Sequence, residues 1–285
     1  MSRSRLVPGV EVVAVPGRGL AVRTSEGEFL SVRTRQADES ALLSLLSGAD
    51  AAPLDEELHR VVRAFEEAGY LAADEPQPPR WPADRRNIRL LGDPALTRPL
   101  AAHLSALGAE PRTTHTVTAP DASPLEIEDL LEGDPAAVAW CLDGPVPDGL
   151  WEAADRLPEH GVAWLRCHRE GWQAYVEPLA AASGDVTAAH VRGRRLAATP
   201  AHRELSAYWS GPRTSSAPVR LTVPAAALLA ALLADDLGRW ATDTPDTAGL
   251  PARRRLRHVD LRTLTVTEHP VLPVPAVASM PRKDG

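Results

Sequence analysis

Lysine is almost absent from this chain. Lys283, close to the last residue, is the single lysine among 31 basic residues, and the other 30 are arginines. Walker-type nucleotide hydrolases, protein kinases and pyridoxal-phosphate enzymes all use a lysine, either on a phosphate or as a Schiff base. The body of the chain offers no such residue, so these three classes of enzyme are excluded.

Cysteine is scarce as well. Cys141 and Cys167 are the only two, and neither belongs to a C-x-x-C pair. That spacing argues against thiolate zinc or iron–sulfur sites and against a disulfide framework. Both lie in apolar runs, where a free cysteine usually packs as a small hydrophobic residue. The nine histidines do not cluster at metal-ligand spacing, so we expect neither a metal nor another cofactor.

Long apolar segments are missing too. The longest run, residues 223–234, contains Pro224 and is too short to span a bilayer. Residues 1–8 have no apolar stretch typical of a signal peptide. The formal net charge is −7, and an acidic surface is unfavourable for binding nucleic acids or anionic membranes. We therefore expect a cytoplasmic protein that binds neither.

The length and composition favour two globular domains. The chain has 285 residues, of which 44% are hydrophobic and 24% charged. Residues 75–84 contain four prolines, which indicates a stiff linker. We expect a first domain over residues 1–75, a linker over 76–86 and a second domain over 87–285.

The first domain has the pattern of strands followed by helices. Segments at 10–15, 20–23 and 28–33, separated by turns, predict three antiparallel strands. Two helices follow, one capped by Asp38 and one opened by Pro53. This is an α+β, winged-helix-like domain. In a DNA reader of that shape the last helix is basic, whereas here it carries five acids against two arginines and would repel DNA.

The second domain alternates between strands and helices, which predicts an α/β fold with a mostly parallel sheet. The expected strands are 87–91, 136–142, 162–167 and 172–176, the expected helices are 97–107, 150–158 and 221–240, and an Arg-rich strand follows at 253–267. A nucleotide site after the first strand needs several glycines. This turn has only Gly92, followed by Asp93, so we do not expect nucleotide binding.

Other polar groups of the second domain look structural. His190 and His202 fall in a region that reads as loop. The arginines at 253–257 are interpreted as a solvated edge strand or a contact to an acidic partner, in preference to a nucleic-acid patch. No paired carboxylates or nucleophile motif stand out.

The first domain also contains a candidate peptide groove. Strand 28–33 sends Leu30 and Val32 to one face, and its outer edge can accept a peptide as an added strand. The neighbouring helix supplies an apolar floor, and arginines line the rim. Leu58 and Phe65 could instead be plain core. The expected peptide-binding residues are Phe29, Leu30, Ser31, Val32, Arg33, Arg35, Leu58, Arg60, Val62, Arg63 and Phe65.

Residues 6–73 resemble the PqqD-like peptide-binding domain, the recognition element of ribosomally synthesised peptide natural-product (RiPP) pathways. The features that carry the resemblance are Pro8-Gly9-Val10-Glu11, the three strands, Leu42-Leu43-x-Leu45-Leu46-x-Gly48 and Phe65-x-x-Ala68-Gly69-Tyr70-Leu71. The family usually has a further short helix, for which residues 49–53 leave no room.

Residues 87–275 resemble a ThiF-like (ubiquitin-activating-enzyme-like) domain. The matching motifs are Trp151-Glu-Ala-Ala-Asp-Arg-Leu-x-x-His160-Gly161-Val162, Gly171 to Pro178, Val259-Asp260-Leu261-x-Thr263-Leu264 and His269-Pro270-Val271-Leu272-Pro273. Active members have a cysteine-paired zinc segment after the proline, but residues 180–190 contain no cysteine. The glycine-rich loop and the lysine are also missing, so the resemblance does not imply adenylation or zinc binding.

The combined order resembles the leader-binding partner of YcaO cyclodehydratases in thiazole/oxazole-modified peptide and thiopeptide biosynthesis. The resemblance implies a noncatalytic subunit whose partners are a precursor leader peptide and a YcaO-type enzyme. Two alternatives remain: a winged-helix transcriptional regulator with a ligand-sensing domain, and an adenylating enzyme that relies only on arginines.

Overall fold

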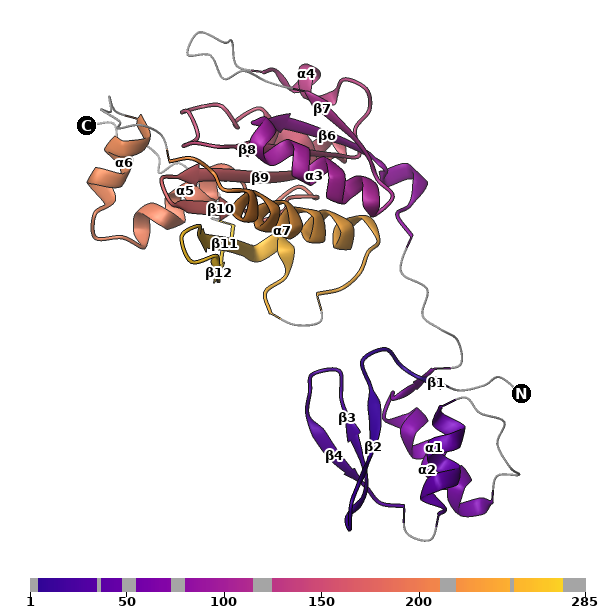
Figure 1. The fold of residues 1–285 in the computed structure, drawn as a ribbon. Helices are drawn as coiled ribbons and strands as arrows, with labels where there is room; N and C mark the ends of the chain where they lie inside the picture. The colour runs from indigo at the N-terminus through magenta and orange to yellow at the C-terminus, as the bar shows by residue number, and fades with distance from the viewer. Residues whose placement is uncertain are drawn as a thin grey trace, which may run out of the picture. The chain divides into compact units, whose positions relative to one another are not determined.

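The computed structural model describes residues 5–34, 37–47, 55–72, 80–114, 125–210, 219–246 and 249–273. The chain divides into two compact units, Met1–Pro79 and Arg80–Gly285 (Figure 1). Each unit is described by itself.

The first unit has the expected α+β order of strands followed by helices. Its elements are β1 (Arg5–Leu6), β2 (Glu11–Val15), β3 (Gly19–Arg23), β4 (Phe29–Val32), α1 (Glu39–Leu46), α2 (Glu56–Glu67) and β5 (Leu71–Ala72). Strands β2, β3 and β4 form an antiparallel sheet in that order, and β1 pairs with β5. The three-stranded prediction is confirmed. The β1–β5 pair was not predicted, because two-residue strands leave no periodicity to detect.

Polar caps set the helix starts in this unit. The Asp38 carboxylate accepts hydrogen bonds from the backbone N–H groups of Ser40 and Ala41, as expected. The Asp55 carboxylate accepts the N–H of Leu58 at 2.7 Å and begins α2, whereas Pro53 lies outside the described residues. Sheet and helices enclose one core, made chiefly by Leu20, Val22, Leu42, Leu46, Leu58, Val61 and Phe65.

The second unit is built on a seven-stranded sheet in the order β12-β11-β10-β9-β8-β6-β7. Its strands are β6 (Asn87–Gly92), β7 (Glu110–Thr114), β8 (Ala137–Leu142), β9 (Ala163–Glu170), β10 (Gln173–Val176), β11 (Arg255–Asp260) and β12 (Thr265–Pro270). Strands β7, β6, β8 and β9 are parallel neighbours, and β10 to β12 continue the sheet as antiparallel strands. The α/β prediction is confirmed. Residues 253–267, expected to be one strand, are a hairpin because the chain turns at 261–264.

Helices cover both faces of this sheet. They are α3 (Pro94–Ala106), α4 (Ile127–Leu131), α5 (Ala188–Ala197), α6 (His202–Ser210), α7 (Val223–Ala241) and the 3-10 helices η1 (Ala83–Arg85), η2 (Ala154–His160) and η3 (Ala252–Arg254). α3 and α7 lie side by side on one face, where they share a core with the sheet. α4 and η2 pack on the other face. The expected helix at 150–158 is therefore the 3-10 helix η2, and His190 and His202, expected in a loop, lie on α5 and α6.

Residues 80–86, which the proline pattern assigned to the linker, belong to the second unit. Trp81 is only 3% exposed and packs into its core. The Trp81 indole N–H donates to the Arg85 carbonyl at 2.7 Å. A buried tryptophan contributes substantially to a core. The second unit therefore begins before Pro82, the last proline of the expected linker.

Two arginines of the 253–257 cluster, Arg255 and Arg257, form a buried ion network, so the assignment of this segment to a solvated edge strand is wrong. Arg255 and Arg257 are 7% and 4% exposed, and each donates to a different oxygen of Asp236 on α7 at 2.6 Å. β11 is an interior strand, and β12 occupies the edge. The two arginines share one strand face, which points toward α7.

Candidate functional site

The first unit contains a cavity of about 410 Å³ between β4 and α2, here called the β4–α2 groove. Its floor and walls are mostly apolar, with polar groups at the rim. The lining residues are Val22, Leu30, Ser31, Val32, Arg33, Thr34, Glu57, Arg60, Val61, Ala64, Phe65 and Tyr70.

Six of the predicted peptide-binding residues line this groove, namely Leu30, Ser31, Val32, Arg33, Arg60 and Phe65. Leu58 is buried and packs into the core of the unit, together with the half-buried Val62. Phe29 and Arg63 are exposed but not part of the lining, and Arg35 lies outside the described residues. That these residues bind a peptide stays a prediction.

Sequence reasoning missed Val61, Ala64 and Tyr70. Helix α2 turns a different face to the groove from the one expected, since Leu58 and Val62 do not line it. Glu57, Val61 and Ala64 follow the three- and four-residue spacing of one helix face, and this face meets the groove. Apolar spacing can indicate that Val61 faces inward, but it cannot show whether the next layer is core or an open cavity.

The outer edge of β4 presents backbone groups. The Thr24 N–H donates to the Glu28 carbonyl at 2.8 Å, and hydrogen-bonded pairs alternate along an antiparallel ladder. The pair of Leu30 with Val22 is therefore hydrogen-bonded, and the N–H and C=O groups of Phe29 and Ser31 point away from β3. Within the described residues, no strand pairs with that outer edge.

This edge also exposes apolar surface. Phe29 is 65% exposed and Leu30 44%. Exposed apolar side chains on an unpaired edge strand favour association with another chain. The charges of the groove lining are those of Arg33, Arg60 and Glu57, and Arg60 donates to both Glu57 oxygens, at 2.8 and 2.7 Å.

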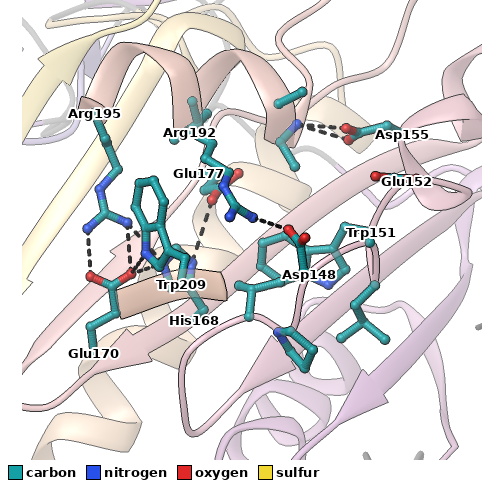
Figure 2. A pocket seen from close by; sticks show the side chains of 17 residues that line it. Asp148, Trp151, Glu152, Asp155, His168, Glu170, Glu177, Arg192, Arg195 and Trp209 are labelled. Atoms are coloured by element: carbon teal, nitrogen blue, oxygen red, sulfur yellow. Dashed lines mark hydrogen bonds and ion pairs between the residues drawn. The ribbon is translucent and has the colours of Figure 1, made fainter. Parts of the chain in front are cut away.

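The second unit contains a cavity of about 360 Å³, here called the α5 cavity (Figure 2). It lies beside the carboxyl ends of β8 and β9, where open α/β sheets usually bind ligands. Loop 146–152 forms one wall and α5 another, and Trp209 of α6 also lines it. The charged and aromatic lining residues are Asp148, Trp151, Glu152, Asp155, His168, Glu170, Glu177, Arg192, Arg195 and Trp209.

A charged network spans the inner part of this cavity. His168 has Nδ1 at 3.5 Å from Glu177 Oε1 and Nε2 at 3.5 Å from Glu170 Oε1. Arg195 donates to both Glu170 oxygens, at 3.0 and 2.6 Å, and the Trp209 indole donates to Glu170 at 2.8 Å. Arg166 lies behind this layer, with Nε at 2.9 Å from Glu177 Oε2.

The two glutamates have opposite pKa shifts. Burial alone would raise the pKa of Glu170, but hydrogen bonds from His168 and Arg195 outweigh it and hold that pKa well below its ordinary value. Burial raises the pKa of Glu177 in spite of Arg166 and His168. The sequence pattern did not indicate this network, because its members come from separate segments.

The turn after β6, where this kind of fold binds a nucleotide, packs closely against the end of β8. Gly92 has φ 106°, and a Cβ there would lie 1.9 Å from the Cys141 carbonyl oxygen. The Asp93 carboxylate accepts the backbone N–H of Asp143 at 2.7 Å, which joins the turns after β6 and β8. A carboxylate held at this turn is unfavourable for phosphate.

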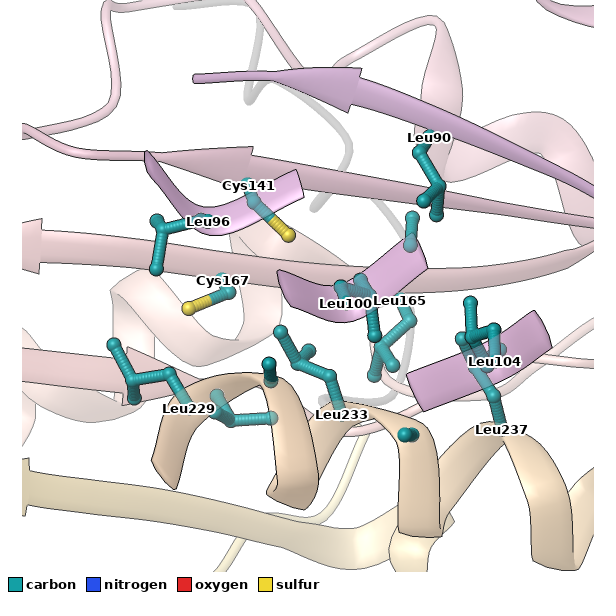
Figure 3. Close-up of a cluster of buried hydrophobic side chains, with 14 of the residues drawn as sticks. Leu90, Leu96, Leu100, Leu104, Cys141, Leu165, Cys167, Leu229, Leu233 and Leu237 are labelled. Atoms are coloured by element: carbon teal, nitrogen blue, oxygen red, sulfur yellow. The ribbon is translucent and has the colours of Figure 1, made fainter. Parts of the chain in front are cut away.

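Both cysteines are buried and lie next to each other in register on the neighbouring strands β8 and β9 (Figure 3). Burial raises the pKa of Cys141 to about 12 and the pKa of Cys167 well above its usual value. Such thiols are poor nucleophiles, and the prediction that both are core residues is confirmed. In the described part of the chain, no three His, Cys, Asp or Glu residues are grouped to hold a metal ion.

No helix within the described ranges is long and apolar enough to cross a bilayer. No family model matches the chain, and no curated protein matches it in sequence.

Solved structures do match. A heterocyclase in complex with substrate and cofactor aligns with a TM-score of 0.59 and 14% identity, over 96% of this chain and 39% of that one. The heterocyclase TruD aligns with a TM-score of 0.60 and 14% identity, over 96% and 42%. E. coli MccB aligns with a TM-score of 0.52 and 9% identity, over 96% and 95%.

This chain spans about two fifths of the length of the two heterocyclases. At these identities the likeness concerns the fold, and it confirms the fold expected from the ThiF-like resemblance. It does not test the PqqD-like resemblance of the first unit. The chain therefore shares its fold, over nearly its whole length, with heterocyclase and MccB structures.

Proposed function

We propose that this protein is a noncatalytic recruiting subunit of RiPP biosynthesis. It binds the leader of a ribosomal precursor peptide in the β4–α2 groove and presents the core to a YcaO-type cyclodehydratase. That partner converts Cys, Ser or Thr residues of the core into azolines. The observation that carries this proposal is the apolar edge of β4, which no strand of the described residues pairs with, beside an open groove.

The geometry of the groove fits an added strand. The outward backbone groups of Phe29 and Ser31 can pair with a peptide, which supplies affinity of low sequence dependence. Val61, Ala64 and Tyr70 then contact alternate side chains of that peptide, which supplies selectivity. Arg33 and Arg60 favour a leader with acidic residues and accelerate encounter.

The second unit supports the noncatalytic part of the proposal. The turn where a nucleotide would bind has a single glycine, Gly92, and carries the Asp93 carboxylate, which accepts the Asp143 N–H. Recruitment raises the effective concentration of substrate, since the core segment of a tethered precursor peptide reaches the partner enzyme at roughly millimolar local levels. The likeness to a heterocyclase described in complex with substrate is in line with this role.

Leader binding to the full chain tests the proposal, with the precursor encoded beside the gene as the probe. Ala64 is exposed and lines the groove, so Ala64→Trp should block it and weaken leader binding by about tenfold or more. Glu67 is exposed on the same helix but outside the lining, so Glu67→Trp serves as the matched control.

Fluorescence anisotropy gives the affinities, and circular dichroism checks that both variants are folded. Equal affinities of folded Ala64→Trp and the unchanged protein would contradict the groove as the leader site. A locus without a YcaO gene and a short Cys/Ser-rich precursor gene would contradict the pathway.

A further inference from the structure

We propose that the α5 cavity is a second peptide site, which takes a segment carrying a basic side chain. Arg192 occupies the place of that side chain until the ligand arrives. This proposal concerns the second unit alone and does not depend on leader binding in the β4–α2 groove.

The charge of the lining selects a cation. The cavity lining has five carboxylates and two guanidinium groups; these are Asp148, Glu152, Asp155, Glu170 and Glu177 against Arg192 and Arg195. The inner carboxylates are held by donors of the protein. Asp155, for example, accepts from Arg166 at 2.8 Å and from the Ala188 N–H at 2.9 Å.

The outer carboxylates are accessible. The side chain of Asp148 is 69% exposed, and Glu152 is exposed on the same loop. An arriving anion would meet these two groups first and be repelled, whereas a guanidinium or ammonium group would be attracted.

The cavity already binds guanidinium groups in one recurring way. The Arg192 guanidinium lies 4.9 Å over the ring of Trp209, and the Arg195 guanidinium lies 5.0 Å over that ring and 3.8 Å over Tyr175. Each of these arginines also donates to a carboxylate, Asp148 or Glu170. An aromatic face combined with an in-plane carboxylate is a favourable environment for a cationic side chain.

The two arginine pairs differ in how easily they open. Arg195 and Glu170 are 14% and 10% exposed and are joined by two hydrogen bonds. Arg192 and Asp148 are 34% and 69% exposed and are joined at 2.7 Å between α5 and the loop (Figure 2). Exposed ion pairs are weak, so a ligand cation can replace Arg192 on Asp148, while Arg195 stays in place.

The apolar part of the lining favours a peptide over a free cation. Trp151 lines the cavity, and its indole Nε1 is buried among the described residues. Val146, Pro147 and Leu150 offer apolar contacts to the stem of a long basic side chain.

Titration of the full-length protein with three tripeptides tests the proposal. The probes are acetyl-Leu-Arg-Leu amide, its citrulline counterpart, which keeps the shape without the charge, and its glutamate counterpart. The readout is the set of tryptophan indole N–H signals by NMR. We expect the arginine peptide to shift the Trp151 signal, to bind about tenfold more tightly than the citrulline peptide, and to weaken as salt rises. Equal binding of all three peptides would overturn the proposal.

Three variants test whether Arg192 competes with the ligand for Asp148. Arg192→Ala removes the internal competitor and should tighten binding of the arginine peptide severalfold, whereas Asp148→Asn should weaken it by about tenfold. Arg239→Ala is the control, because Arg239 forms a comparable exposed pair with Asp235 outside the cavity lining.

Thermal melts establish that the variants are folded. Binding of the arginine peptide to Arg192→Ala alone, without detectable binding to the unchanged protein, would also support competition by Arg192. Failure of the arginine peptide to bind the folded Arg192→Ala variant at millimolar concentration would overturn the proposal, as would tighter binding to Asp148→Asn.

Discussion

Glu170 shows how single residues decide the chemistry of the second unit. Burial alone would raise its pKa, yet His168 on the same strand and Arg195 on α5 hold that pKa well below its ordinary value, and Trp209 on α6 also donates to it. Because its pKa in the folded protein lies below the value of about 4.3 in an unfolded chain, Glu170 stabilises the fold above that value. This contribution is lost as pH falls toward the pKa of the folded state.

Glu170→Gln should therefore lower the free energy of unfolding by about 2 kcal/mol at neutral pH, because Arg195 loses its charged partner in a mostly buried site. The deficit relative to the unchanged protein should narrow below about pH 4. Urea denaturation at several pH values measures it. Glu159→Gln, at an exposed pair with Arg156, should have little effect. A deficit that is constant down to pH 3 would show that the glutamate acts by shape alone.

Gly92 is a second residue at which a single change should alter stability, because the site has no room for a Cβ atom. An alanine there would combine a positive φ with a Cβ at 1.9 Å from the Cys141 carbonyl oxygen, so Gly92→Ala should destabilise the protein by about 4 kcal/mol. Gly171 also has a positive φ, but no atom in the described part of the chain lies within 4 Å of a Cβ built there. Gly171→Ala should cost only about 1–2 kcal/mol. Equal losses in thermal denaturation would contradict the clash.

At the scale of elements, strand β4 joins fold and proposed function. Its inner backbone groups hold it to β3, and its outer groups face the open edge. The same strand thus has positions that the fold needs and positions that are available to a ligand, and they alternate along the chain.

Proline substitutions can separate these two sets of positions. Ser31→Pro removes an outward N–H and should leave the fold intact, since proline is tolerated on edge strands, while leader affinity should fall about tenfold. Leu30→Pro removes an inward N–H and should unfold the first unit. Circular dichroism and leader anisotropy distinguish the two. Full leader affinity in folded Ser31→Pro would show that the peptide does not pair with β4.

At the scale of the whole molecule, the chain consists of two units with separate cores. Residues 1–79 and residues 80–285, produced separately, should each unfold cooperatively. Residues 1–79 should bind the leader about as tightly as the full chain, and residues 80–285 should not. Scanning calorimetry and anisotropy measure both properties. Leader binding that needs the full chain would show that the site is shared between the units.

The second unit should also fail to bind ATP. Asp93 places a carboxylate at the turn where this kind of fold holds phosphate, and its hydrogen bond from the Asp143 N–H holds the carboxylate there. Isothermal calorimetry of the full chain with ATP should show no binding at micromolar concentrations. Micromolar affinity would contradict the noncatalytic role and favour an adenylating enzyme.

The sequence alone determined what depends on neighbours along the chain. Periodicity located strands β2 to β4 and helices α1, α3 and α7, because amphipathic spacing and caps are local properties. It also indicated that strand 28–33 and helix α2 form a groove, and six of the eleven residues named there line it.

Only the tertiary structure decided which helix face meets the groove, that Arg255 and Arg257 are buried on Asp236, and that Trp81 belongs to the second core. The His168, Glu170 and Arg195 network of the α5 cavity likewise joins β9 and α5, which are distant in sequence. Burial and pairing of charges depend on which segments meet in space. No periodicity records that meeting, so these groups could not be predicted from the pattern.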